Sequence, residues 1–149
     1  MLVDSKKHKL NPLQIIIAAH HQNPRRTLKQ FVGMVEIEMK MPQVFKCQEG
    51  NTIFLIHRTA VPGVGYLKTV NADTPRNFIK SCQKIAELVY HAGFDKLIAQ
   101  TDQKSIVNIF KRIVDHPVRP HMKLILQKTN IGSHQCVLQL GHSRTKGKQ

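Results

Sequence analysis

The stretch from Gly65 to Phe110, GYLKTVNADTPRNFIKSCQKIAELVYHAGFDKLIAQTDQKSIVNIF, decides the fold because it predicts a strand–helix–strand–helix unit. Short runs rich in apolar and β-branched residues predict strands over 65–71 and 97–101. Asp73-Thr74-Pro75 is a helix-start signal, Gly93 ends a helix over 78–92, and a second helix is predicted over 102–114. Ligand-binding α/β cores often have glycines or a proton donor at such strand-to-helix junctions, and these junctions have neither. We therefore expect that the chain has the scaffold of an enzyme but uses it for something other than catalysis.

Both predicted helices carry apolar residues at spacings of three and four, which places those residues on one face of each helix. The opposite faces are charged or polar. We expect each apolar face to pack against a sheet as part of the core. The residues of the two faces are Phe78, Cys82, Ile85, Ala86 and Val89 on the first helix, and Ile106, Val107, Phe110, Ile113 and Val114 on the second.

On either side of this unit the sequence predicts a single domain over 11–141, between a basic flexible lead (1–10) and a basic flexible tail (142–149). Asn11-Pro12 predicts the start of a helix that ends near residue 21. The segment 27–39 fits a helical stripe, although part of it also fits strand alternation, and we favour a helix. Strands are predicted over 44–47 and 52–58 as the start of a β-meander, and over 122–128 and 134–140 as a closing hairpin. The fold class is thus α/β (α+β), with one sheet flanked by helices.

The charge of the chain favours an anionic macromolecule as partner. The 149 residues contain 23 Lys and Arg against nine Asp and Glu, a formal net charge of +14. Such a positive field attracts DNA, acidic protein surfaces and anionic membranes alike. We expect the basic residues near the chain ends and before the second N-terminal helix to bind DNA or an acidic protein: Lys6, Lys7, Lys9, Arg25, Arg26, Arg144, Lys146 and Lys148.

Cys47, Cys82 and Cys136 lie far apart in apolar segments, so we expect buried free thiols in a reducing compartment, neither a disulfide framework nor a zinc site. The N-terminal residues do not resemble a secretion signal, and no apolar run approaches the length of a membrane span. These observations predict an intracellular or virion-associated protein with no membrane span.

Other candidate site residues carry less chemistry. His57 lies on an apolar strand and is expected to be a hydrogen-bonded core histidine. Glu36 and Glu38, with Glu49, form the densest acidic group, which we expect to be a solvated face. The adjacent residues His20 and His21 point about 100° apart on a helix, which disfavours their binding one metal ion. We therefore assign no catalytic residue and no metal site.

The order of the predicted elements resembles the GNAT superfamily of acetyl-CoA-dependent acetyltransferases over residues 11–140. In that family two helices precede an antiparallel meander, and a strand–helix–strand–helix unit and a hairpin follow. The segment Gln103-Lys-Ser-Ile-Val-Asn-Ile-Phe-Lys-Arg112 is similar to the family's helix motif N-x-x-A-I-x-L-Y-x-K. The resemblance implies a central mixed, mostly antiparallel sheet flanked by helices.

The chain departs from that family where the family binds CoA. The family's pyrophosphate loop, Q/R-x-x-G-x-G/A, corresponds here to residues 70–77, VNADTPRN, which contain no glycine. Only Arg76 and Asn77 are candidates for CoA binding, and only if acetyl-CoA binds at all. The family's tyrosine that protonates the leaving thiolate corresponds to Phe110, which has no proton to donate. The resemblance implies the fold and argues against the activity.

These observations predict a non-catalytic GNAT-like structural or interaction protein without a cofactor. By analogy with degenerate GNAT-like domains among the internal virion proteins of short-tailed phages, we expect association with a phage virion and other virion proteins. One alternative is an active N-acetyltransferase with a divergent loop for acetyl-CoA. Another is a non-specific nucleic-acid-binding or inhibitory protein, for which Tyr66 and Phe54 are the aromatic candidates on the strands.

Overall fold

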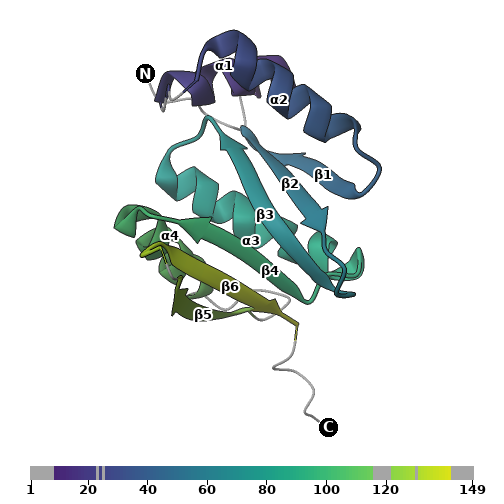
Figure 1. Cartoon of the computed structure of the whole chain (residues 1–149), viewed down its shortest axis with the longest axis vertical. Coiled ribbons are helices and arrows are strands. Elements are labelled where there is room, and N and C mark those ends of the chain that lie inside the picture. The colour runs from purple at the N-terminus through teal and green to yellow at the C-terminus, as the bar shows by residue number, and fades with distance from the viewer. Residues whose placement is uncertain (1–8, 23, 25, 116–121, 130, 142–149) are drawn as a thin grey trace, which may run out of the picture.

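The computed structural model describes residues 9–22, 24, 26–115, 122–129 and 131–141 (Figure 1). In this part of the chain six strands form one sheet in the order β1-β2-β3-β4-β6-β5. Neighbouring strands are antiparallel except β3 and β4, which are parallel. The elements are α1 (Pro12–Gln22), α2 (Leu28–Lys40), β1 (Val44–Glu49), β2 (Thr52–Arg58), β3 (Val64–Asn71), α3 (Pro75–His91), β4 (Lys96–Thr101), α4 (Lys104–Asp115), β5 (Met122–Lys128) and β6 (His134–Leu140).

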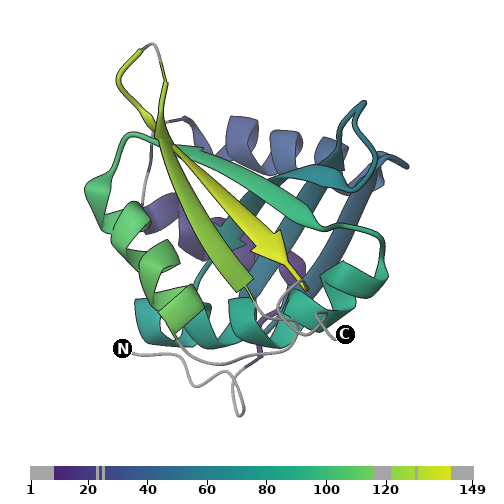
Figure 2. The ribbon, with the colours of Figure 1, turned by 90° about the horizontal axis from the view of Figure 1, so that it is seen from below.

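The sheet is covered on both faces, as Figures 1 and 2 show: α1 and α2 lie on one face, α3 and α4 on the other. Strand β2 contributes to both cores because successive side chains of a strand point to opposite faces. Phe54 and Ile56 pack against the α3–α4 side, whereas Ile53 and Leu55 pack against the α1–α2 side. The sheet with its two helical layers confirms the predicted fold class.

The helical and strand patterns of the sequence are confirmed with small shifts of their bounds. The ambiguous segment 27–39 is the helix α2, which begins with a capping box between Thr27 and Gln30. The apolar stripes of α3 and α4 lie in one core cluster under the sheet, and Phe110 is 5% exposed within it. Helix α3 starts at Pro75 with Thr74 as its N-cap, and Gly93 follows it with a φ of 108°.

The N-terminal lead joins the domain before the predicted boundary. The Leu10 amide donates to the Asn51 side chain (2.8 Å), and its carbonyl accepts from Gln48 Nε2 (2.9 Å). Residues 1–8 and the tail 142–149 lie outside the described residues. Within the described ranges, no helix has the length and hydropathy needed to cross a lipid bilayer.

The parallel strands β3 and β4 are paired only at their first residues. Their register runs from Val64 opposite Lys96 to Tyr66 opposite Ile98. Beyond this point β3 continues to Asn71 without β4 beside it, while β4 stays paired with β6 through Thr101. The divergence of the two strands opens the sheet on the side where α3 and α4 begin.

Candidate functional site

A cleft of about 540 Å³ lies where β3 and β4 diverge. Its walls come from the end of β3, the first turns of α3 and α4, and one side of α1 and α2. Apolar side chains such as Phe31, Ile106 and Ile109 form one part of the lining, and Thr69 and Asn71 are among its polar residues. Among the described residues that line the cleft, none is lysine or arginine. The cleft has the size of a small-ligand site but offers no cationic side chain to a phosphate.

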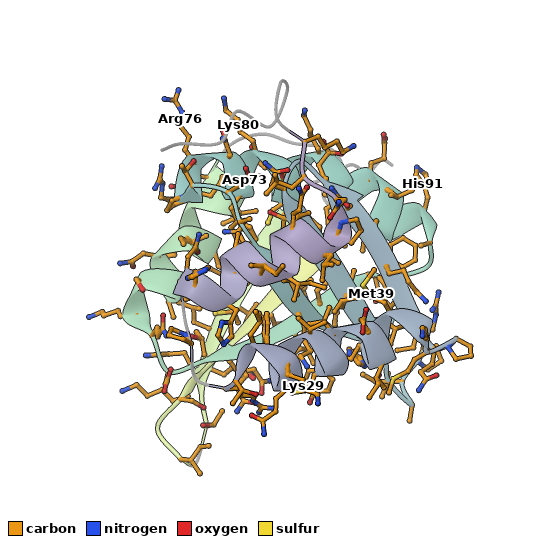
Figure 3. The ribbon with its side chains drawn as sticks, turned by 90° about the horizontal axis from the view of Figure 1, so that it is seen from above. Lys29, Met39, Asp73, Arg76, Lys80 and His91 are labelled. Carbon is orange, nitrogen blue, oxygen red and sulfur yellow. The ribbon has the colours of Figure 1, made fainter. Side chains whose placement is uncertain are left out.

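The start of α3, at the edge of this cleft, has little capacity to bind phosphate. The Thr74 hydroxyl already accepts a hydrogen bond from the Asn77 amide (3.4 Å), and Pro75 has no N–H to donate. The Asp73 carboxylate is buried in the cleft wall and accepts from the Asn51 amide at 2.8 Å. Its negative charge opposes an anion at the same place. Arg76 points away from the body of the domain in Figure 3 and does not line the cleft.

The backbone of this junction also lacks the conformation that a glycine-rich phosphate loop uses. In the described chain the residues with positive φ are glycines 50, 63, 93, 132 and 141, and none of them lies between Ala72 and Asn77. A loop of L-residues with side chains on every Cα keeps the backbone amides farther from a ligand than glycines would. The residues present therefore do not fit the pyrophosphate of CoA.

Helix α4 presents no proton donor to the cleft. Ile106 and Ile109 line it, whereas Phe110 is buried in the core between α4 and the sheet. The sequence comparison with the acetyltransferase motif placed Phe110 at the position of a catalytic tyrosine. In the structure even a tyrosine at this position would have its side chain directed into an apolar core.

A cluster of polar side chains on the α1–α2 face of the sheet joins α2 to β2 and β3. Glu38 is only 8% exposed, so the prediction that it belongs to a solvated face is wrong. His57 Nε2 donates to the Glu38 carboxylate at 2.6 Å, and Lys68 Nζ lies 3.0 and 3.1 Å from its two oxygens. The carboxylate can be buried because hydrogen-bond donors from two strands pair with it. The expected hydrogen-bonded role of His57 is confirmed. Because the Glu38 carboxylate is already bonded to His57 and Lys68, we regard the cluster as structural.

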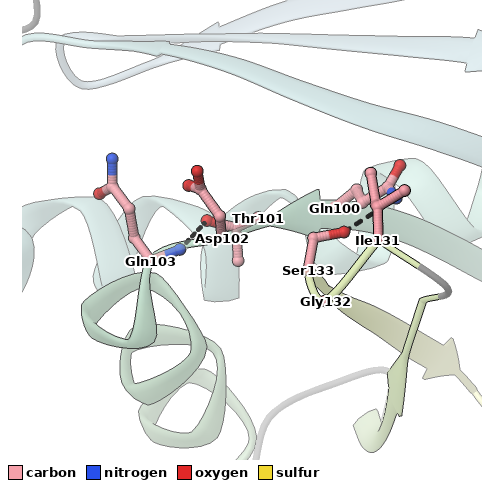
Figure 4. A pocket seen from close by; sticks show the side chains of 7 residues that line it. All are labelled: Gln100, Thr101, Asp102, Gln103, Ile131, Gly132 and Ser133. Atoms are coloured by element: carbon pink, nitrogen blue, oxygen red, sulfur yellow. Dashed lines mark hydrogen bonds between the residues drawn. The ribbon is translucent and has the colours of Figure 1, made fainter.

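A shallow hollow of about 510 Å³ lies between the end of β4 and the β5–β6 turn (Figure 4). Gln100 Nε2 donates to Ser133 Oγ (3.2 Å) across it, and Thr101 Oγ1 accepts from the Gln103 amide (3.0 Å). Asp102 is its charged residue, and the described residues of the lining include no histidine or cysteine. The hollow thus lacks a nucleophile–base pair. The sequence analysis did not identify this hollow, because Gln100 and Ser133 on its two sides are 33 residues apart in the chain.

Among the described residues, the cysteine thiols and the side chains that could bind a metal ion also form no reactive site. Burial raises the pKa of Cys82 and Cys136, and burial together with the Glu49 charge raises the pKa of Cys47 to about 11. Cys82 and Cys136 are buried, as predicted, whereas Cys47 is half-buried. A thiol with a raised pKa is a poor nucleophile at neutral pH. The described residues contain no group of three or more side chains suited to hold a metal ion.

Of the residues predicted to meet an anionic partner, the structure describes Lys9 and Arg26, and both are exposed. They lie on different parts of the domain. Lys9 precedes Leu10 beside the β1–β2 turn, whereas Arg26 precedes α2 and its guanidinium contacts Met34. Phe54 is fully buried and cannot stack on a base, so only Tyr66 of the two proposed aromatics is accessible. The other predicted partner-binding residues, Lys6, Lys7, Arg25, Arg144, Lys146 and Lys148, lie outside the described residues.

The fold is that of the GNAT acetyltransferases. One similar solved structure is the ribosomal-protein-S18-alanine N-acetyltransferase from Escherichia coli, with a TM-score of 0.50, over 95% of this chain and 96% of that chain. The identity is 8%, so the likeness shows the fold alone. No protein-family profile and no curated protein sequence matches the chain. By its fold, the chain is thus a GNAT-like domain. The start of its helix α3 differs from a CoA-binding loop.

Proposed function

We propose that this protein is a non-catalytic GNAT-like interaction module that binds an anionic macromolecule. The observation that carries the proposal is the start of α3, where Thr74 caps the helix, Pro75 lacks a donor and Asp73 adds a negative charge. Binding of a pyrophosphate at a helix N-terminus needs several backbone N–H groups that converge on it. With no donor at Pro75 and the Asn77 amide already bonded to Thr74, the cleft is a remnant of the fold's geometry and not a CoA site.

The anionic partner is inferred from charge. The net charge of +14 makes association with polyanions favourable at physiological salt. The alternative of an active acetyltransferase with acetyl-CoA finds no supporting feature in the cleft, whose described lining has no cation. The hypothesis of a phage virion role is not supported by the comparisons and forms no part of this proposal.

The test is a calorimetric titration of the full chain with acetyl-CoA, together with an acetylation assay on a mixed panel of amines and proteins. We expect no saturable binding at micromolar concentrations and no acetyl transfer. Micromolar binding of acetyl-CoA, or a turnover that Arg76→Gln abolishes, would show that the active acetyltransferase is the correct assignment.

A further inference from the structure

The outer face of α2 carries apolar side chains that neither core of the domain includes. Gly33 and Ile37 lie one helical turn apart, on the side of α2 opposite the buried Val35. Ile37 is 61% exposed, and both Ile37 and Met34 lie outside the two core clusters. A shallow hollow of about 680 Å³ lies over this face, with Gly33, Met34 and Ile37 in its lining. The domain thus leaves the apolar centre of this helix face open.

Gly33 is a residue that the fold of the domain does not require. It lies in the interior of α2, where glycine is the least favourable residue after proline. It is not among the glycines with positive φ, and a Cβ at this position would have no atom within 4 Å. A glycine on an exposed helix face does, however, allow another chain to approach the helix backbone closely.

Cations lie at both ends of this apolar centre. Arg26 and Lys29 lie at its N-terminal end and Lys40 at its C-terminal end, and all three are exposed. Figure 3 shows Lys29 at the margin of α2 that lies away from α1. Among the residues that the structure describes, no ion pair involves any of the three. The exposed acidic residue of α2 is Glu36, so three cations stand against one exposed carboxylate.

Two of these cations are unfavourably placed for the helix itself. The N-terminus of a helix carries a partial positive charge, which repels nearby cations. Arg26 and Lys29 lie at this end of α2, and the first turn contains no acidic residue that would offset them. A carboxylate from outside the domain would relieve the repulsion, so the charge of this face favours an acidic partner.

The composition of the face distinguishes a protein helix from the other possible partners. An apolar centre with a charged rim is the pattern of a protein interface. A nucleic acid would need exposed aromatic rings for stacking, and the aromatic residue of α2, Phe31, lines the cleft on the other side of the helix. A second copy of the chain would bring the same excess of cations to the contact. An amphipathic helix fits the face, because its apolar side chains recur at the same spacing of three and four residues.

Building on the proposed function, we propose that the outer face of α2 docks an acidic amphipathic helix of a partner protein. A large apolar side chain of the partner helix packs over Gly33, between Met34 and Ile37. Carboxylates on either side of it pair with the cations at the two ends of α2. The 13 residues of α2 span about 20 Å, which corresponds to about four turns of the partner helix.

The test measures binding of the full chain to a fluorescently labelled synthetic peptide by fluorescence anisotropy. The peptide has about 20 residues and places leucine on one helical face with glutamate on both sides of that face. One control peptide has glutamine in place of every glutamate. A second control peptide has the same composition in a scrambled order, so that leucine is spread around the helix.

Variants of the apolar centre locate the contact on α2. Ile37→Ser removes the exposed aliphatic side chain, and its matched control is Leu88→Ser on α3, where the leucine is 53% exposed. Gly33→Leu fills the hollow from within the helix. Leucine is a good helix former and the position is open, so this variant keeps the fold. Thermal unfolding of each variant verifies folding.

A charge variant tests the rim of the same face. It replaces Arg26, Lys29 and Lys40 with Gln. The matched control makes the same change at three exposed cations of α3, so both variants lose the same charge. The three residues of the control are Arg76, Lys80 and Lys84.

We expect saturable binding of the glutamate peptide and at least about tenfold weaker binding of both control peptides. Ile37→Ser and Gly33→Leu should each weaken binding about tenfold, because changes at the centre of an interface have effects of this size, whereas Leu88→Ser should change it less than about twofold. The α2 charge variant should weaken binding about tenfold and reduce its dependence on salt, and the α3 control should weaken it less than about threefold.

Three results would overturn the inference. The first is no saturable binding of the glutamate peptide, and the second is an equal loss for an α2 variant and its α3 control. The third is a wild-type dimer in sedimentation that Gly33→Leu dissociates, which would favour a second copy of the chain on this face. Binding of a DNA duplex in any of these cases would leave the proposed function intact. Micromolar binding of acetyl-CoA would instead refute the proposed function.

Discussion

Replacement of Glu38 tests whether the buried cluster under α2 stabilises the fold. Glu38 accepts a hydrogen bond from His57 on β2 at 2.6 Å and contacts Lys68 on β3 at 3.0 Å, with 11% of its side chain exposed. A hydrogen bond to a charged group contributes about 1.5–3 kcal/mol, whereas the contact with Lys68, whose side chain is 52% exposed, adds less than about 1 kcal/mol. We expect Glu38→Gln to lower the free energy of unfolding by about 2 kcal/mol.

The assay is urea unfolding followed by circular dichroism, with Glu36→Gln as the matched control. Glu36 lies on the same helix, undergoes the same chemical change and is exposed, so its replacement should change stability by less than about 0.5 kcal/mol. A double-mutant cycle with His57→Ala should give a coupling energy above about 1 kcal/mol. If Glu38→Gln costs no more than Glu36→Gln, the carboxylate does not anchor α2 and our reasoning fails.

Further predictions concern turns, caps and thiols. Gly65→Ala should destabilise the protein by about 1–3 kcal/mol in thermal or urea unfolding, because the new methyl group would overlap Ile56 and Phe94, whereas Gly33→Ala, in open space on α2, should stabilise it by about 0.5–1 kcal/mol. Equal effects of the two changes would contradict the packing around β3. Thr74→Ala should cost about 1 kcal/mol through loss of the α3 cap, and an unchanged urea midpoint would mean that the helix starts elsewhere. Since the pKa of Cys47 is raised from 9.0 to about 11 in the folded state, the unfolded thiol ionises first, and the stability that this thiol contributes should fall as pH rises from 9 through 11. The Cys47→Ala variant should show a shallower fall, and identical pH profiles would refute this cause.

The start of α3 could be predicted from the sequence, because the signals that begin a helix lie in neighbouring residues. The absence of glycine, the proline at the first turn and the capping threonine are local features, and the structure has the helix begin where they indicate. The cleft beside them could not be predicted. It depends on where β3 and β4 lose their pairing after Tyr66, which is decided by packing between elements far apart in the chain.

The sequence by itself determined the elements of this protein, since the spacing of apolar residues follows the period of a helix or a strand and depends on nothing outside the segment. It also determined the excess of positive charge. Tertiary structure alone decided that Glu38 is buried, because its partners His57 and Lys68 lie 19 and 30 residues away. Tertiary structure likewise decided that Leu10 and Gly141 lie near opposite ends of α3, since the contacts that place them there join residues far apart in the chain.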